Sequence, residues 1–147
     1  MLDSNFYFED LTVVDMFGGS GNISYEFLSR GVAKLYVIEK DFKNFRFISS
    51  NIKQLADKES YSLIKGDCFK KIPALADEGV KADLVFADPP FAAKFIETIP
   101  DFVFESGILK GDGWLILEHD KRNDFSKHPL LKDKRKYGGV LFSIFYK

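Results

Sequence analysis

The sequence Asp88-Pro89-Pro90-Phe91 combines residue types that suit an amino group attached to an aromatic ring. Two consecutive prolines fix two φ angles and remove two amide donors, so the carbonyls beside them face no competing N–H group. Asp88 adds a hydrogen-bond acceptor, and Phe91 adds a ring on which a planar group can stack. The lone pair of an exocyclic base amine is delocalised into its ring, and acceptors on the N–H groups localise that pair and orient it. The motif therefore predicts a site for the amine of a nucleic-acid base.

A glycine-rich turn in the first half of the chain is suited to close contact between the backbone and a ligand, because glycine has no Cβ. The turn and the acidic residue before it comprise Asp15, Phe17, Gly18, Gly19 and Gly21. Glu39 follows at about the distance where dinucleotide-binding folds place an acidic acceptor for ribose hydroxyls. Ser24 stands where the GxGxxG pattern requires its third glycine. The turn and Glu39 together predict a cofactor that contains a ribose, but they do not match the dinucleotide pattern.

Short apolar runs alternate along the chain with segments of helical spacing. The predicted strands are residues 11–15, 35–38, 61–64, 82–87 and 113–118. Apolar strands separated by helices are typical of a mostly parallel sheet covered on both faces. Both motifs directly follow a predicted strand, and ligands of open α/β sheets bind at the carboxyl ends of the strands. The fold class predicted is therefore α/β, with one domain over residues 1–147.

Four segments have the apolar spacing of amphipathic helices. They are residues 20–30, 41–56, 68–76 and 91–105, the last interrupted by Pro100. Asp41 is the predicted N-cap of the second helix, and Gly31 is expected to end the first. The apolar face predicted for the second helix consists of Phe42, Phe45, Ile48, Ile52 and Leu55. Most of the 16 phenylalanines are expected in the core, because large rings bury much apolar surface.

The end of the chain differs from the rest in pattern and charge. Residues 132–137 and 140–146 are strand-like and joined by Gly138-Gly139, which predicts a hairpin that adds antiparallel strands and brings the sheet to seven. Residues 121–147 hold eight Lys or Arg against two Asp, whereas the remaining residues hold 13 against 20 acidic ones. This block is either a surface for nucleic-acid phosphate or a solvated tail. The candidate RNA contacts are Lys132, Lys134, Arg135 and Lys136.

Composition excludes several classes of protein. The 147 residues are 46% hydrophobic and 29% charged, an ordinary balance for a globular domain. Cys68 is the single cysteine, and His119 and His128 lie far from it, so no metal site is expected. His119 is expected to be a structural polar residue, and a catalytic role for the Cys68 thiol is not expected. The chain has neither an apolar run of about 18 residues nor the plan of a signal peptide, so we expect a cytoplasmic monomer without membrane contact.

The motifs resemble those of class I methyltransferases that act on amino groups. The segments that carry this resemblance are 17–21, Glu39, 66–68 and 88–91. More closely, the sequences at 15–22, 28–31 and 86–91 are similar to those of the RsmD family, and the similarity extends over nearly the whole chain. The resemblance implies a Rossmann-like fold and transfer of a methyl group from S-adenosylmethionine to the N2 amine of a guanine in small-subunit (16S) ribosomal RNA. S-adenosylhomocysteine would be the second product, and no metal would be needed.

The resemblance also implies roles for particular residues. Asp15 and the turn 17–21 would hold the methionine part of the cofactor, and Glu39 would bind the ribose hydroxyls. Asp67 and Cys68 would contact the adenine, Asp67 through the adenine amine. Residues Asp88, Pro89, Pro90 and Phe91 would form the catalytic motif that holds the guanine. The partner would be ribosomal RNA or the assembled small subunit.

One departure from the family concerns the N-terminus. Family members carry an arm before the first strand, whereas only about ten residues precede it here. The sequence is therefore expected to be a truncated form. Three alternatives stay open at this point: a DNA adenine-N6 methyltransferase, a protein glutamine methyltransferase, and a non-catalytic module that binds S-adenosylmethionine. A nicotinamide dehydrogenase is disfavoured by the Asp-Pro-Pro-Phe motif.

Overall fold

The computed structural model describes residues 8–90 and 92–147. The chain forms two compact units, Met1–Lys71 and Ile72–Lys147. The expectation of a single domain stays a prediction. Among the described residues, no helix has both the length and the apolar character that crossing a membrane requires. The expected cytoplasmic location also stays a prediction.

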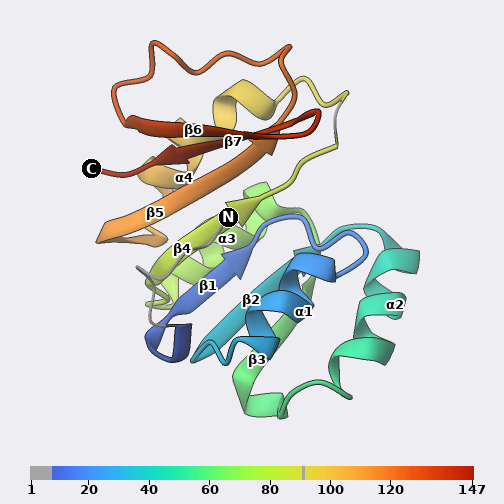
Figure 1. Ribbon diagram of the computed structural model, residues 1–147. Helices are drawn as coiled ribbons and strands as arrows, with labels where there is room; N and C mark the ends of the chain where they lie inside the picture. The colour runs from blue at the N-terminus through green and yellow to red at the C-terminus, as the bar shows by residue number, and fades with distance from the viewer. Residues whose placement is uncertain (1–7, 91) are drawn as a thin grey trace. The chain divides into compact units, whose positions relative to one another are not determined.

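The first unit is built on three parallel strands, which Figure 1 shows in blue to green. They are β1 (Thr12–Asp15), β2 (Lys34–Glu39) and β3 (Tyr61–Lys65). The helices are η1 (Phe8–Asp10), α1 (Asn22–Ser29), α2 (Phe42–Ile52) and η2 (Lys58–Ser60), and α3 (Cys68–Asp77) begins at the end of this unit. The right-handed rule for parallel connections places α1 and α2 on the same face of these strands, as Figure 1 shows.

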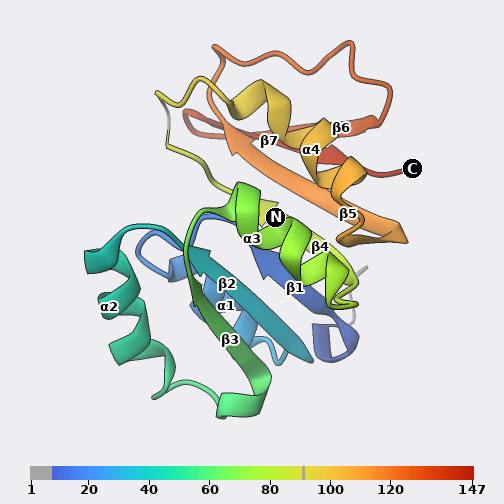
Figure 2. The same cartoon turned by 180° about the vertical axis from the view of Figure 1, so that it is seen from behind.

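The second unit contains parallel and antiparallel pairs, as predicted. Its strands are β4 (Ala82–Ala87), β5 (Leu109–His119), β6 (Leu131–Tyr137) and β7 (Val140–Phe145). The pair β4 and β5 is parallel, β7 is antiparallel to β5, and β6 is antiparallel to β7. Its helices are η3 (Ile96–Thr98) and α4 (Ile99–Ser106), and Figure 2 shows α4 in front of β5 and β7. All seven predicted strands are therefore confirmed among the described residues, as is the hairpin.

The helix α2 is shorter than predicted, and fewer residues of its predicted apolar face are buried. Its N-cap is confirmed, because the Asp41 side chain accepts a hydrogen bond from the Asn44 amide at 2.9 Å. Ile48 and Ile52 are fully buried. The prediction was wrong for Leu55, which is 54% exposed because α2 ends at Ile52 and the chain turns away. It was also wrong for Phe42, which is 59% exposed.

Phe42 is the first residue of α2, and two cations lie near its exposed ring. The guanidinium of Arg46 lies 5.7 Å and the ammonium of Lys65 lies 6.0 Å from the centre of the Phe42 ring. Among the described phenylalanines, four are buried: Phe27, Phe86, Phe125 and Phe145. The expectation that most would be in the core is therefore wrong. The other described rings are half-buried or exposed, and aliphatic side chains fill most of the core.

The predicted helix over residues 91–105 is also corrected. The chain from Ala92 to Phe95 is irregular, and the α-helix begins only at Ile99. Pro100 lies in the first turn of α4, where its missing N–H has no helical acceptor and its fixed φ suits the helix. Pro100 therefore lies at the start of a helix that it was expected to interrupt. Phe91 lies outside the described residues.

Ile48 generates a test of how the first unit is held together. Its side chain is fully buried, and its Cδ1 would lie only 2.9 Å from a Cβ added to Gly18 of the glycine turn. We expect Ile48→Ala to lower the free energy of unfolding by about 2–5 kcal/mol, because it leaves a cavity. The matched control is Phe47→Ala on the same helix, whose ring is 56% exposed. We expect this control to cost less than about 1 kcal/mol. Equal losses in urea unfolding would contradict the assignment of Ile48 to the core.

Candidate functional site

The glycine turn lies directly after β1 and is held close to the end of β2. The Gly18 amide donates to the Ile38 carbonyl at 2.9 Å, and the Gly21 amide donates to the Gly18 carbonyl at 2.8 Å. A Cβ added to Gly18 would lie 3.0 Å from Cγ1 of Val37, so only glycine fits there without a shift. Gly21 has a φ of 87°, the left-handed conformation that favours glycine, and it forms the N-cap of α1. The glycines therefore allow a tight turn against two neighbouring elements.

Glu39 connects this turn to the start of α2. One carboxylate oxygen, Oε1, accepts a hydrogen bond from the Gly19 amide at 2.6 Å, and Oε2 accepts one from the Asp41 amide at 2.6 Å. The side chain is 8% exposed. A carboxylate offers about four acceptor positions, so both oxygens can still accept from a ligand. The sequence indicated Glu39 as a ligand-binding residue, and the structure adds that it organises the turn.

Asp15 is the last residue of β1, before the glycine turn, and is 1% exposed. Its Oδ2 accepts a hydrogen bond from the Ser24 hydroxyl at 2.7 Å, which joins the end of β1 to α1. Ser24 is the residue that replaces the third glycine of the dinucleotide pattern, and the sequence alone gave no indication of this contact. The geometry therefore gives Asp15 a structural contact, and its predicted contact with a cofactor stays a prediction.

Asp67 lies between β3 and α3, and Cys68 is the first residue of α3. The Asp67 Oδ1 accepts from the Phe69 amide at 3.0 Å, and the Asp67 carbonyl accepts from the Lys70 and Lys71 amides at 2.9 Å each. The Gly66 amide donates to the Glu39 carbonyl at 3.0 Å, which brings this segment beside the end of β2. The first unit therefore brings the glycine turn, Glu39 and the segment before α3 together, and their binding of a cofactor stays a prediction.

The Cys68 thiol is an apolar part of this site. The residue is 4% exposed. Burial, followed by the nearby negative charge of Asp67, raises the pKa of the Cys68 thiol to about 12. Because the thiolate is the nucleophilic form, a thiol of this kind is inert at neutral pH. This agrees with the expectation that Cys68 has no catalytic role.

The proline motif follows β4 in the second unit. Pro89 is buried, Pro90 is exposed, and the Pro90 carbonyl accepts a hydrogen bond from the Ala93 amide at 3.0 Å. The Pro90 carbonyl is thus used within the following turn, and the Pro89 carbonyl stays the predicted acceptor for a ligand. Phe91 is not among the described residues, so its stacking role stays a prediction.

A second carboxyl group, that of Glu118, lies against Asp88. In the parallel register of β4 and β5, Ala87 pairs with Leu117, and each is followed by one of the two acids. The two acids are therefore neighbours on adjacent strands. Burial, followed by the charge of Asp88 and hydrogen bonding to it, raises the pKa of Glu118 to about 7. Sequence reasoning missed Glu118, although its place at the end of the fifth predicted strand was a usable signal.

His119 lies on the other side of β5 and is 2% exposed. Its Nδ1 is 2.8 Å from the Asp120 carbonyl oxygen, and its Nε2 is 2.7 Å from the Ser143 hydroxyl. Both ring nitrogens therefore have partners within the fold, and the expected structural role of His119 is confirmed.

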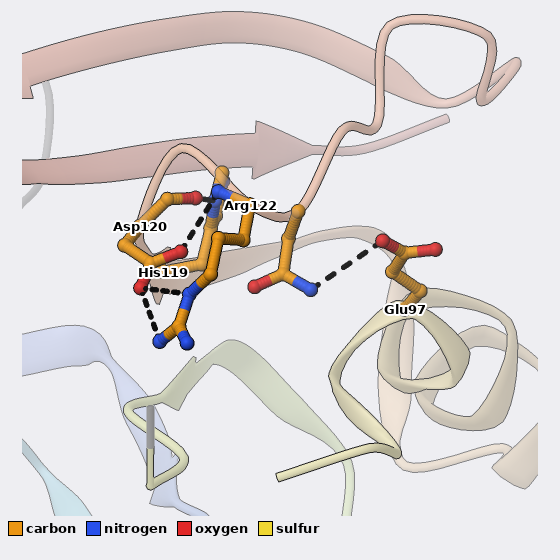
Figure 3. A network of polar contacts seen from close by, with 5 residues as sticks. Glu97, His119, Asp120 and Arg122 are labelled. Atoms are coloured by element: carbon orange, nitrogen blue, oxygen red, sulfur yellow. Dashed lines mark hydrogen bonds and ion pairs between the residues drawn. The ribbon is translucent and has the colours of Figure 1, made fainter. Parts of the chain in front are cut away.

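Figure 3 shows polar contacts of the segment that follows β5, where Arg122 binds the Asp120 carboxylate at 2.6 Å. In the same view Glu97 accepts a 3.4 Å hydrogen bond from Asn123.

The four candidate RNA contacts all lie on the strand β6 or at its start. Lys134 pairs with Ser143, and Arg135 pairs with Phe142, so successive basic side chains point to opposite faces of the strand. The Arg135 Nε donates to Asp133 at 3.0 Å, and the Lys132 Nζ lies 5.8 Å from the centre of the Tyr146 ring. Lys136 is exposed. The strand therefore presents cations on both faces, and RNA contact stays a prediction. In the described part of the chain, no cluster of His, Cys, Asp or Glu could hold a metal ion.

Two curated relatives are ribosomal RNA methyltransferases by name. The chain is 29% identical over 115 residues to "Putative rRNA methyltransferase YlbH" of Bacillus subtilis, covering 78% of this chain and 62% of that protein. It is 25% identical over 127 residues to ribosomal RNA small subunit methyltransferase D of Escherichia coli K12, covering 82% and 59%. The chain thus spans about three fifths of the length of these two relatives.

Solved structures share the fold. A conserved hypothetical protein of Streptococcus pyogenes superposes with a TM-score of 0.84 at 27% identity, covering 96% of this chain and 89% of that one. An RNA methyltransferase of Salinibacter ruber, solved with S-adenosyl-L-homocysteine, has a TM-score of 0.73 at 15% identity, covering 95% and 82%. These likenesses confirm the predicted fold class.

The family model described as conserved hypothetical protein 95 matches residues 1–146, almost the whole sequence. Together with the relative from Escherichia coli, this match confirms the resemblance to the RsmD family. The chain belongs to the family of conserved hypothetical protein 95.

Proposed function

We propose that this protein transfers a methyl group from S-adenosylmethionine to the exocyclic N2 amine of a guanine in small-subunit ribosomal RNA. The observation that carries the proposal is the Asp88-Pro89-Pro90 motif at the carboxyl end of a buried parallel strand. The names of both curated relatives support ribosomal RNA as the substrate over DNA or a protein glutamine. The S-adenosylhomocysteine in the Salinibacter ruber structure supports the cofactor.

The residues of the first unit fit this cofactor. The Glu39 carboxylate is fixed by two amide donors and keeps acceptor capacity for two vicinal ribose hydroxyls. Asp67 uses one carboxylate oxygen to accept from Phe69, and its other oxygen suits the amine of adenine. The turn at Gly18, where a Cβ would clash, allows the backbone to approach the methionine part. When bound, S-adenosylmethionine supplies a sulfonium methyl group that is already electrophilic.

The residues that follow β4 would act on the guanine. Asp88 and the Pro89 carbonyl would accept hydrogen bonds from the two N–H groups of the amine, and Phe91 would stack on the ring. These contacts make the nitrogen lone pair available and hold it in line for transfer, so that positioning supplies most of the catalysis. The methylated nitrogen then loses a proton to water or to Asp88. Since the amine must reach a protein pocket, the guanine is expected to be unstacked or single-stranded.

Glu39 tests the cofactor site. We expect Glu39→Ala to weaken binding of S-adenosylhomocysteine by about 1–3 kcal/mol, because the ribose loses a charged acceptor and the Gly19 amide loses its partner. Titration calorimetry measures this change. The matched control is Glu59→Ala, which removes an exposed carboxylate from the same unit and is expected to leave affinity within the error of the measurement. Unchanged affinity in Glu39→Ala would remove Glu39 from the cofactor site.

Asp88 tests the target site. We expect Asp88→Ala to lower turnover by on the order of 100-fold or more, because the amine loses an acceptor that orients it. Affinity for S-adenosylhomocysteine is expected to change little. The assay is methylation of ribosomal RNA, both free and in small subunits that lack the modification, with mass mapping of the product. Asp101→Ala, an exposed acid in the same unit, is the control. Methylation of guanine by Asp88→Ala at the wild-type rate would remove the motif from the mechanism.

The basic strand tests the RNA contact. We expect the double variant Arg135→Glu and Lys136→Glu to weaken RNA binding and to reduce the slope of log affinity against log salt by about 1–2, since fewer counterions are released. The control is Lys53→Glu with Lys58→Glu, two exposed cations of the first unit, which should change the slope less. An unchanged slope in the β6 variant would show that this strand is only a solvated surface.

A further inference from the structure

Two carboxyl groups meet at the end of the parallel pair β4 and β5, and only one of them belongs to the proline motif. Asp88 is exposed over much of its surface, and Glu118 is half-buried beside it. The register that pairs Phe86 with Ile116 and Ala87 with Leu117 brings these acids side by side. Two ionised carboxylates side by side repel, so such a pair is more stable when it holds one proton.

The surroundings of Glu118 favour its neutral form. Glu118 pairs with Phe142 on β7, and the Phe142 ring lies 6.5 Å from the ring of Phe86, on the same face of the strands. These rings replace water next to the carboxyl group. Burial is accordingly the largest cause of the raised pKa of both acids.

The charged groups around Glu118 are already engaged with each other. Phe142 of β7 pairs with Glu118 on one side and with Arg135 of β6 on the other, so these three residues form one row across the strands. The Arg135 guanidinium binds Asp133 at 3.0 Å. Beyond the end of β5, Asp120 is bound by Arg122 at 2.6 Å. Phe142, the residue of β7 in this row, carries no charge. Asp88 is therefore the charged group that decides how Glu118 titrates.

Exposure to water decides which of the two acids holds the proton. Asp88 is exposed, whereas Glu118 is half-buried in a row with the Phe142 ring. The more buried acid of such a pair is the one whose neutral form is favoured, and as a neutral acid Glu118 has a proton to donate to Asp88. One Asp88 oxygen then accepts from Glu118, and the carboxylate keeps acceptor capacity for a substrate.

We propose that Glu118 is a positioning residue for amino methylation: as a neutral acid it donates a hydrogen bond to Asp88 and fixes the Asp88 carboxylate in the orientation that accepts the N–H of the target amine. This inference rests on the function proposed above and assigns Glu118 a role in it. Asp88 would contact the amine, and Glu118 would act through Asp88. A second ionised carboxylate at this place would instead push Asp88 away from that orientation.

The inference sets a direction for the pH dependence of activity. The pKa of Glu118 is raised to about 7, so its proton is present below that pH and is lost as the pH rises through it. The positioning bond disappears with the proton. Turnover at saturating cofactor and RNA is therefore expected to decline above about pH 7 because of Glu118.

The test compares wild type, Glu118→Ala and Glu118→Gln from pH 6 to 9 on the ribosomal RNA substrate that wild type methylates. Glutamine keeps a donor at the same place and does not ionise in this range. We expect Glu118→Ala to lower kcat by about tenfold or more with little change in cofactor affinity. We expect Glu118→Gln to restore kcat to within about threefold of wild type at pH 7, and to remove the decline above it.

Other outcomes separate this inference from the proposed function. If wild type methylates no guanine in ribosomal RNA, the proposed function fails. If wild type is active and Glu118→Ala keeps its rate and pH profile, or if Glu118→Gln is as impaired as Glu118→Ala, the positioning role is overturned. The control is Glu105→Ala, an exposed acid on α4 in the same unit.

A measurement on the wild-type protein keeps the inference testable if a variant does not fold. Carbon-13 spectra of the glutamate carboxyl groups give the titration of Glu118 without substrate. We expect a midpoint near neutral pH, moving down in Asp88→Asn, which removes the neighbouring charge. A Glu118 midpoint in the ordinary glutamate range in wild type would show that the acids do not share a proton and would overturn the proposal.

Discussion

The carboxylate of Glu39 is the contact on which the geometry of the first unit's site depends. A glycine turn is conformationally permissive, so its shape must be set by contacts outside the glycines. Glu39 sets it by accepting one short hydrogen bond from the turn and another from the residue that caps α2. Charge-assisted bonds of this kind are stronger than neutral ones. The same side chain therefore orders two backbone segments before any ligand is bound.

The two chemically important acids of the two units show how environment decides the role of a carboxyl group. Glu39 is almost fully buried, yet two amide donors bind its oxygens, and it can serve as an acceptor. Glu118 is less buried, but its neighbours are aromatic rings and a second carboxylate, so its neutral form is favoured. The neighbouring groups, more than the degree of burial, therefore decide that Glu39 accepts hydrogen bonds and that Glu118 donates one.

Much of the fold could be predicted because it depends on local patterns. The seven strands, the Asp41 cap and the hairpin at Gly138-Gly139 follow from apolar runs, capping residues and turn residues close together in sequence. The exposure of Phe42 could not be predicted from helical spacing, because Phe42 is the first residue of α2 and the local sequence does not specify what the end of a helix packs against. Glu118 was missed for a related reason. Its significance depends on the register of β4 against β5, and the sequence does not specify which residues two distant strands bring opposite each other.

The strand β6 has a consequence for the behaviour of the protein in solution. Among the described residues it pairs with β7 along one side only, so its other side offers backbone N–H and C=O groups to any passing strand. Its sequence Lys132-Asp-Lys-Arg-Lys136 places a charge at every one of these positions, on alternating faces of the strand. A second chain that added to this edge would have to bring its own backbone beside five ionised side chains and remove much of their water. The segment therefore protects the protein against aggregation through its sheet, whether or not it also contacts RNA.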